Sequence, residues 1–498
     1  MSWSSKNGLR TFGVVLVLIL LVSWLKVDPG SEVDESVAAT GDDIEAEEAG
    51  ELVDDAAGEG EAGDAPTEGA ATKGAAPNSP AAKGAVATPG EATQAGPASK
   101  AGLECKAGRN GGQTDTGVSG SKIRVASTAV LDGEARSLLA DSVTGMKAVV
   151  DKVNRAGGIC GRLLDLTVVN DSFKDNDGLR VLRNFIEEGY FALPVVPSAE
   201  GLGAAILGGW IDRAKIPVVG TDGMRQEQYT SDWVWPVASA TVTAMRVMAK
   251  YGYEKKGAKK FAIVWDEKYQ FGREGKDAFK AQVAAMGGEV VADVALNPDL
   301  NSYASEVNEF NGKCKDRNCD MVAMLLLPDT AARWMVRQPE RAGLYTAGAQ
   351  TLFTDDFAQK CVQAAGPLCG DIAVWTGYNP PVGAIASKPG VASYVNDVRA
   401  ADPRVDVNNQ FVEGAYLGMS VFVEALKRVG PELTRARLRQ VMDSMTFETD
   451  LASTLTWAPK KHTANARSRS FSIVVSQGTF TGWREEAGGF YLDPVHGG

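Results

Sequence analysis

Apolar segments short enough to be buried strands alternate with longer amphipathic segments from Lys122 onward. In the first amphipathic segment, apolar residues recur at spacings of four and three, which is one face of a helix. These residues are Leu139, Val143, Met146, Val150 and Val153. Strands that alternate with helices predict parallel sheets with helices on both faces. Because the alternation runs twice, we expect an α/β fold with two Rossmann-like lobes.

The first run predicts strands at 123–130, 163–169, 190–196 and 216–219, with helices up to 157 and at 178–188 and 201–213. The second predicts strands at 260–265, 289–296 and 321–327, with helices at 240–251, 272–286, 303–312 and 330–342. Further on we expect a strand at 371–376, helices at 411–429 and 435–445, and a hairpin at 470–483. We assign 104–238 plus 371–455 to lobe 1 and 239–370 plus 456–498 to lobe 2, so that the parallel sheets are joined by a three-strand hinge.

The first 27 residues predict an export signal. Lys6 and Arg10 precede an apolar run at 11–25, and positive charge before such a run keeps that end inside the cell. The run is short for a full span and long for the core of a cleaved signal. No cysteine follows it closely, and the nearest small-residue cleavage sequence, Ala38-Ala39-Thr40, lies well downstream. We favour an uncleaved signal anchor at 1–27 over a cleaved signal. Either one places the rest of the chain on the extracellular face of the membrane.

Residues 28–103 predict a disordered acidic linker rich in Ala, Gly and Pro. The segment has no aromatic residue and cannot bury enough apolar surface to offset the entropy of ordering. It carries 17 acidic residues and three lysines, which leaves 46 acidic and 45 basic residues in 104–498. The folded part is therefore nearly neutral. It has no basic surplus of the kind that binds nucleic acid.

Six cysteines lie in the exported part, at Cys105, Cys160, Cys314, Cys319, Cys361 and Cys369. An even number in an oxidising compartment favours disulfides, although six cysteines allow about 15 pairings. Proximity in sequence favours Cys314–Cys319 and Cys361–Cys369, which leaves Cys105–Cys160. The alternative is a metal site at Cys314 and Cys319. It is disfavoured because the only two histidines, His462 and His496, lie far away in the sequence. We expect neither a metal nor a cofactor.

Four short motifs occur in order along the chain. The first is Asn154-Arg155-Ala156-Gly157-Gly158-Ile159-Cys160-Gly161, and the second is Lys215-Ile216-Pro217-Val218-Val219. The third is Ile263-Val264-Trp265-Asp266 with Phe271-Gly272, and the fourth is Arg341-Ala342-Gly343-Leu344. Together they resemble the leucine/isoleucine/valine-binding protein family of type I periplasmic binding proteins, over about residues 122–480. The fourth motif is one residue shorter than the family pattern, and the long prefix at 1–103 departs from the family's short leader.

The resemblance implies a type I periplasmic binding protein fold and a ligand between the lobes. Ligands of open parallel sheets bind beyond the carboxyl ends of the strands. By resemblance, Ser198 and Thr221 would bind a ligand carboxylate, Phe271 would cover the ligand, and Asp355 or Asp356 would take an ammonium group. Trp265, Tyr269 and Asp329 lie in the same set of loops. Glu200 and Asp222 depart from the pattern, because their charges would weaken carboxylate binding and leave room for a cationic, amide or polar ligand.

A structural interpretation of the same residues stays open. Ser198 and Thr221 can be helix caps or turn residues, and Asp355 can be a solvated acid at a helix start. Trp265 and Phe271 can be core residues, because aromatic side chains near strand ends often are.

The resemblance implies the substrate-binding protein of an ABC importer. It would capture an amino acid or similar small polar solute by hinge closure and present it to an ABC transporter permease. The alternative is a ligand-sensing receptor ectodomain that signals to a partner. That role is disfavoured because such sensors usually continue into a cytoplasmic domain. An anchored hydrolase is least favoured, because the folded part has neither a Gly-x-Ser-x-Gly elbow nor a phosphate-binding Gly-rich loop.

Overall fold

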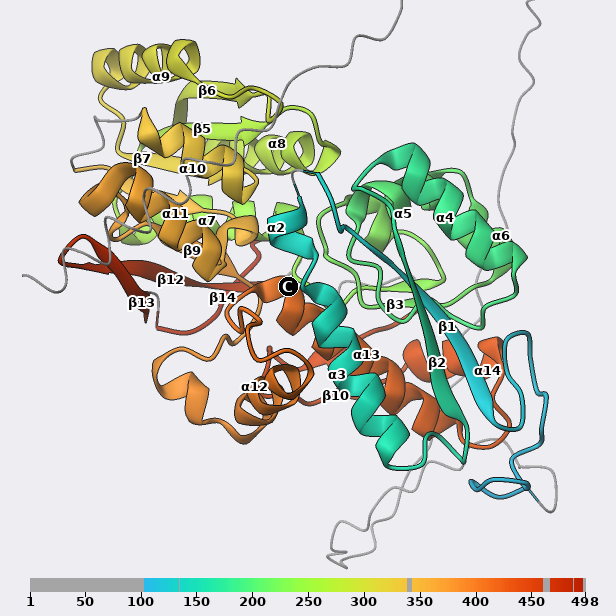
Figure 1. Cartoon of the computed structure of the whole chain (residues 1–498). Helices are drawn as coiled ribbons and strands as arrows, with labels where there is room; N and C mark the ends of the chain where they lie inside the picture. The colour runs from blue at the N-terminus through green and yellow to red at the C-terminus, as the bar shows by residue number, and fades with distance from the viewer. Residues whose placement is uncertain (1–102, 134, 338–342, 460–465, 487, 496–498) are drawn as a thin grey trace, which may run out of the picture. The chain divides into compact units, whose positions relative to one another are not determined.

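The computed structural model describes residues 103–133, 135–337, 343–459, 466–486 and 488–495, all within one compact unit, Ala92–Gly498 (Figure 1). The predicted signal anchor and nearly all of the predicted linker lie outside the described residues.

Lobe 1 is built on a layer of parallel strands. β1 (Lys122–Ala129) pairs along its whole length with β2 (Leu163–Asn170), and β3 (Val218–Val219) pairs with β4 (Val234–Trp235). The extended segment at 192–196 links the two pairs through isolated parallel bridges, one to β1 and two to β3 and the residues after it. The strand predicted at 190–196 is therefore present as isolated bridges between β1 and β3.

Lobe 2 contains an eight-stranded sheet with the order β13-β12-β9-β8-β7-β5-β6, in which β14 also pairs with β12. Its parallel strands are β5 (Lys260–Asp266), β6 (Glu289–Leu296), β7 (Met321–Leu325), β8 (Tyr345–Gly348) and β9 (Ala373–Thr376). The antiparallel part is β12 (Arg467–Ser476), β13 (Thr479–Glu485) and β14 (Tyr491–Leu492). A separate antiparallel pair joins β10 (Thr446–Phe447) to β11 (Leu455–Thr456).

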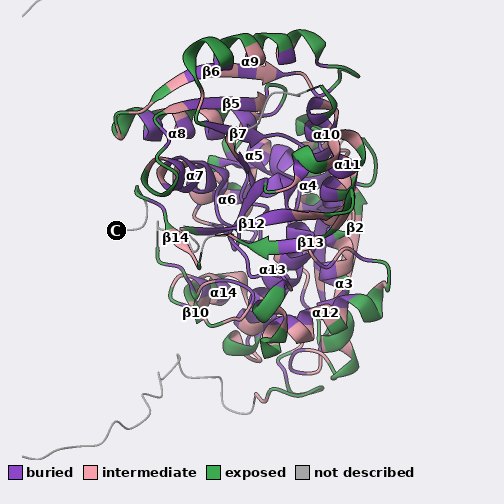
Figure 2. Ribbon diagram, turned by 90° about the vertical axis from the view of Figure 1, so that its left-hand side faces the viewer, coloured by how far each residue is buried: buried purple, intermediate pink, exposed green. Residues whose placement is uncertain are grey.

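Helices cover both layers. Those of lobe 1 are α2 (Arg136–Leu139), α3 (Ser142–Arg155), α4 (Asp175–Glu187), α5 (Ala199–Leu207), α6 (Trp210–Ala214), α12 (Pro389–Ala401), α13 (Gln410–Val429) and α14 (Arg435–Met442). Those of lobe 2 are α7 (Thr241–Lys255), α8 (Gln270–Ala285), α9 (Ala304–Arg317), α10 (Pro328–Val336) and α11 (Asp355–Ala365). The 3₁₀ helices are η1 (Gln226–Tyr229), η2 (Gln350–Leu352), η3 (Gly366–Cys369) and η4 (Gly383–Ser387). Figure 2 shows the central strands of the larger sheet buried and the outward face of α9 exposed.

The chain passes between the lobes after β4, after β9 and after β11. The predicted α/β fold is confirmed, but two details differ. β9 pairs with β8 in the larger sheet, so the return to lobe 1 comes after Thr376 and not at 371. The helix predicted at 201–213 is two helices, because Gly209 takes a left-handed conformation (φ 67°) between α5 and α6.

All three predicted disulfides are confirmed: Cys105–Cys160, Cys314–Cys319 and Cys361–Cys369. The spacing of Cys314 and Cys319 thus reflects a short disulfide loop after α9, and the metal interpretation is wrong.

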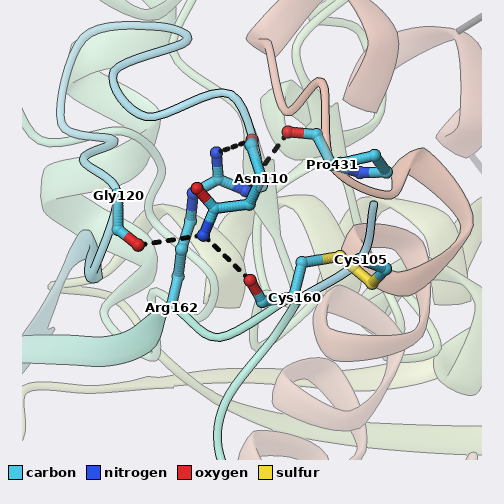
Figure 3. Close-up of a disulfide and its surroundings, with 6 residues drawn as sticks. All are labelled: Cys105, Asn110, Gly120, Cys160, Arg162 and Pro431. Atoms are coloured by element: carbon cyan, nitrogen blue, oxygen red, sulfur yellow. Dashed lines mark hydrogen bonds between the residues drawn. A yellow bond between two sulfur atoms is a disulfide. The ribbon is translucent and has the colours of Figure 1, made fainter. Parts of the chain in front are cut away.

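Arg162 holds the entry segment of the chain against lobe 1 (Figure 3). Its side chain is fully buried. It donates hydrogen bonds to the carbonyl groups of Ser119 (2.8 Å), Gly112 (3.1 Å), Pro431 (3.2 Å) and Asn110. The Cys105–Cys160 disulfide lies beside it. The segment that precedes β1 is therefore fixed by one covalent bond and several hydrogen bonds to a cation.

Steric constraints explain why the first sequence motif has glycine at position 158. This residue has a φ of 75°, and a Cβ atom there would lie 2.0 Å from the carbonyl oxygen of Arg162. Only glycine fits such a turn without moving the backbone.

Candidate functional site

Four of the predicted site residues gather at the carboxyl ends of the lobe 1 strands. Ser198 and Glu200 begin α5, and Thr221 and Asp222 follow β3. Each is at most 5% exposed. A parallel bridge between Val196 and Thr221 joins the two loops. The sequence therefore predicts correctly that these four residues share one edge of the layer.

The loop after β3 is organised by Gln228 in η1. The hydroxyl of Thr221 donates to Gln228 Oε1 (2.7 Å), and Gln228 Nε2 donates to Asp222 Oδ1 (2.7 Å). The N–H of Met224 also donates to Asp222 Oδ1 (3.1 Å). Among the described residues, no group is within hydrogen-bonding geometry of Asp222 Oδ2, although that atom is buried. Burial raises the pKa of Asp222 to about 7, against the opposing effects of Gln228, the Met224 and Ala199 N–H groups and Arg225.

Arg225 is the cation of this edge, and it was not among the site residues predicted from the sequence. It forms ion pairs with Glu200 (2.9 Å) and Glu227 (2.9 Å). Burial raises the pKa of Glu200 to about 8, although Arg225 opposes the shift. Glu274 of α8 reaches this group from lobe 2 and accepts a hydrogen bond from the N–H of Gln226 (2.9 Å). The ionic group therefore includes residues of both lobes.

Ser198 lies beside Asp171, which follows β2. Burial raises the pKa of Asp171 to about 6, and the Phe173 N–H and the hydroxyls of Ser198 and Thr128 oppose that shift. The side chain of Ser198 makes no capping hydrogen bond to α5.

A small cavity lies at this edge. Its volume is about 10 Å³, near the space needed by one water molecule. The lining residues are Val195, Pro197, Thr221, Asp222, Tyr378, Gln410, Phe411, Gly414 and Ala415. They come from the two lobe 1 loops, from the segment after β9 and from the start of α13. The cavity therefore adjoins a hinge segment.

Glu413 is a second buried acid near the cavity. It is 0% exposed, and neither of its carboxyl oxygens has a hydrogen-bond partner among the described residues. Burial raises its pKa well above the usual value, while the Asn379 N–H and Arg469 oppose the shift. Glu413 and Asp222 both raise the pKa of Tyr378, so both lie within electrostatic range of that hydroxyl. An acid within the apolar first half of α13 is the signal that could have identified it.

Tyr269 and Phe271 belong to an apolar cluster that spans both lobes. Tyr269 stacks on Phe271 with ring centroids 5.7 Å apart, and it meets Phe173 of lobe 1 edge to face at 5.1 Å. Met224, Leu138 and Leu139 of lobe 1 belong to the same cluster. Figure 1 shows α2, which carries the two leucines, between the larger sheet's helices and β1. The lobes thus meet through these side chains.

The other predicted site residues bind protein groups. Trp265 donates to Asp293 (2.8 Å) and lies under the Lys276 ammonium. Asp329 pairs with Lys360 (2.7 Å), and Asp355 accepts from Trp483 Nε1 (2.7 Å) and from Asn408. None of these three lines the cavity.

In the described part of the chain, no group of three His, Cys, Asp or Glu side chains is arranged to hold a metal ion. No helix in it has the length and apolar character needed to cross a membrane.

The sequence model of the periplasmic binding protein family matches residues 122–479. Among curated protein sequences, none matches the chain significantly. Solved structures match it at low identity. A fatty acid ABC transporter substrate-binding protein from Thermomonospora curvata is 16% identical, with a TM-score of 0.64 over 78% of this chain and 96% of that chain.

Two further structures were solved with ligands. One is a branched-chain amino acid transporter substrate-binding protein from Streptococcus pneumoniae in complex with isoleucine, 14% identical, with a TM-score of 0.61 over 74% of this chain and 99% of that chain. The other is a solute-binding protein from R. palustris in complex with 4-hydroxybenzoate, 14% identical, with a TM-score of 0.62 over 76% of this chain and 98% of that chain. At these identities the likeness establishes the fold, and the ligands belong to those proteins.

Proposed function

Because the chain belongs to the periplasmic binding protein family, we propose that it is the substrate-binding protein of an ABC importer. In this proposal the lobes close around a small polar solute and bury it against the carboxyl ends of the lobe 1 strands. The solved relatives are named as substrate- or solute-binding proteins, which bind and release without covalent chemistry.

The observation that carries the proposal is the arrangement of buried polar groups beside a hinge. Thr221 and Asp222 line a cavity together with Tyr378, which follows β9 at a passage between the lobes. Across from this edge, Tyr269 and Glu274 of lobe 2 contact lobe 1. A hinge motion that separates the lobes would break these contacts and open the edge to solvent.

The proposed partners are a solute, a permease and a membrane. The apolar run at 11–25 would anchor the chain on the outer side of the cell membrane, and residues 28–103 would connect this anchor to the folded part. A permease would recognise the closed lobes.

The test uses the full-length chain purified in mild detergent. We expect mass spectrometry of solutes released by denaturation to identify a small polar molecule. We also expect this molecule to stabilise the refolded chain against heat and to reduce its radius of gyration in small-angle X-ray scattering. If no released solute binds the refolded chain again, the capture function is rejected. If a solute binds without any change in the scattering curve, hinge closure is rejected.

A further inference from the structure

We propose that the lobe 1 edge receives a cationic group of the ligand, such as a protonated amine, on Asp222 and Glu413, and that it does not bind a ligand carboxylate. This inference rests on the proposed capture function and specifies the class of solute.

Several of the groups that could bind a carboxylate already interact with the protein. The hydroxyl hydrogen of Thr221 is donated to Gln228 Oε1, so only the oxygen lone pairs of Thr221 remain for a ligand. Ser198 Oγ has no hydrogen-bond partner among the described residues, but it lies beside the Asp171 carboxyl group, whose charge opposes a ligand carboxylate. Arg225 pairs with Glu200 and Glu227. Arg469, whose charge acts on Glu413, pairs with Glu485 and donates to Asn379, and its Nε has no hydrogen-bond partner among the described residues.

Carboxyl oxygens without a donor lie at the cavity, on Asp222, and next to it, on Glu413, which precedes the lining residue Gly414. Asp222 Oδ2 and both carboxyl oxygens of Glu413 are buried without a hydrogen-bond partner among the described residues. A buried acceptor left without a donor is costly, by about 1–3 kcal/mol for a neutral group and more for a charged one. A ligand N–H group would remove that cost, whereas a ligand oxygen anion would increase it.

The cavity lining also suits a cation. Asp222 and Thr221 offer oxygen atoms, and Tyr378 and Phe411 add aromatic rings. Aromatic faces attract cations within about 6 Å of the ring centre. No basic residue is among the lining residues. At about 10 Å³ the cavity can admit only a small head group in this conformation, so the rest of the ligand must lie toward lobe 2.

The acids of lobe 2 that the family resemblance implies for an ammonium group are engaged elsewhere. Asp355 is bonded to Trp483 and Asn408, and Asp356 is paired with Lys360. The acids with unpartnered oxygens, Asp222 and Glu413, both lie in lobe 1. The cation subsite therefore lies on lobe 1.

Proton release follows from this geometry. Burial raises the pKa of Asp222 to about 7, and Arg225 and Gln228 oppose this shift. The other polar and charged groups around it are Glu200 on α5 and Tyr378 and Glu413 on the hinge side. A bound cation stabilises the ionised carboxylate and lowers this pKa again, so binding expels a proton near neutral pH. The affinity for a cation therefore rises with pH up to about 7, whereas the affinity for an anion falls.

The experiment compares four solutes with the same four-carbon spacing, by calorimetry on the full-length chain freed of bound solutes. The solutes are putrescine (a dication), 4-aminobutyrate (a zwitterion), succinate (a dianion) and 1,4-butanediol (neutral). We expect putrescine to bind at least about tenfold more tightly than the other three. Measurements in buffers of different ionisation enthalpy should show proton release.

Two variants locate the subsite. Asp222→Asn keeps the Oδ1 acceptor for Met224 and Gln228 and replaces the unpartnered oxygen with an amide, so the fold should survive. We expect it to weaken putrescine binding about tenfold or more and to abolish proton release. Glu413→Gln should also lower the affinity for putrescine. The matched control is Asp165→Asn, because Asp165 lies on β2 with a half-exposed side chain and pairs with Lys122.

The outcomes separate this inference from the capture function. Tighter binding of succinate or butanediol than of putrescine, or unchanged putrescine affinity in both variants, overturns the cation subsite while capture stands. If none of the four solutes binds, the charge of the molecule released from the purified protein tests the inference instead. A cationic molecule whose affinity falls in Asp222→Asn supports the subsite, and an anion or neutral molecule overturns it. If the protein releases no molecule that binds again, the capture function itself fails.

Discussion

Asp171 lies at the turn after β2, where Ser172 and Phe173 both have positive φ angles. Its Oδ1 accepts a hydrogen bond from the Phe173 N–H (3.1 Å), and its side chain is almost fully buried. Burial raises its pKa from 3.8 to about 6. The folded protein therefore holds a proton on Asp171 at pH values where the unfolded chain has released it.

Because proton binding at Asp171 is coupled to folding, the direction of its pKa shift determines how pH changes the free energy of unfolding. A carboxyl group with a raised folded-state pKa costs stability as the pH rises from about 4 to about 6, and the loss persists above that range. We expect the wild-type chain to lose about 2 kcal/mol of unfolding free energy through Asp171 between about pH 4.5 and about pH 7. Asp171→Asn should remove that part of the slope. Urea denaturation at both pH values measures it, and equal slopes in the two proteins would contradict the assignment.

At the residue scale, the sequence predicts positions better than partners. Ser198, Glu200, Thr221 and Asp222 lie together because the ends of parallel strands meet at one edge, and that follows from the strand pattern. Their hydrogen-bond partners could not be predicted in this way. Gln228 and Arg225 lie in or next to a 3₁₀ helix with no periodic signal, and their roles follow from tertiary contacts.

At the scale of elements, α4 and α5 approach each other through glycine. A Cβ atom on Gly201 would lie 2.5 Å from the Cα atom of Gly178. Gly201→Ala should therefore push the helices apart and lower the unfolding free energy by about 1–3 kcal/mol. The control is Gly312→Ala in α9, where a Cβ atom meets nothing within 4 Å. There the higher helix propensity of alanine should add up to about 1 kcal/mol. Thermal denaturation of both variants tests the contrast, and equal shifts in Tm would reject the close packing.

The disulfides differ in the length of chain that they close. Cys105–Cys160 spans 55 residues and Cys314–Cys319 spans 5. In the chain-entropy model, replacing both cysteines by serine should cost about 4 kcal/mol for the first and about 2 kcal/mol for the second. Urea denaturation of the two double variants measures the difference. A larger loss from the shorter loop would show that strain or local packing outweighs loop entropy.

At the element scale, long periodic segments are the most predictable. The helix predicted at 411–429 is α13, and the hairpin predicted at 470–483 is β12 with β13. β8 was not predicted, because a strand of four residues that ends in glycine is too short to show an alternating apolar pattern. β9 was assigned to the wrong lobe because sheet membership depends on pairing with β8, which the strand's own sequence does not contain.

At the scale of the whole molecule, the lobes meet through Tyr269 and Phe173. Aromatic edge-to-face pairs contribute about 0.5–1.5 kcal/mol beyond area burial. Tyr269→Ala should therefore favour separated lobes and increase the radius of gyration of the solute-free chain in X-ray scattering. The control is Tyr253→Ala, because Tyr253 lies near the end of α7 and its ring faces the Lys259 ammonium of the same lobe. Identical scattering curves from the two variants would show that this aromatic contact does not hold the lobes together.

Two lobes and three passages of the chain follow from the repeated alternation of strands and helices, so the sequence predicts the architecture well. The contacts between the lobes are harder to predict, because α2, Phe173 and Met224 come from loops and a single helical turn. Such contacts depend on the angle between the lobes, which no local pattern encodes.

The Cys105–Cys160 disulfide and the hydrogen bonds of Arg162 determine where a force on the N-terminal segment would act, if the chain is tethered as proposed. Tension along the N-terminal tail would enter the molecule at Cys105 and pass directly into the strands and helices of the first lobe. Because the second lobe is attached only through the hinge segments, this tension would not oppose its rotation relative to the first lobe.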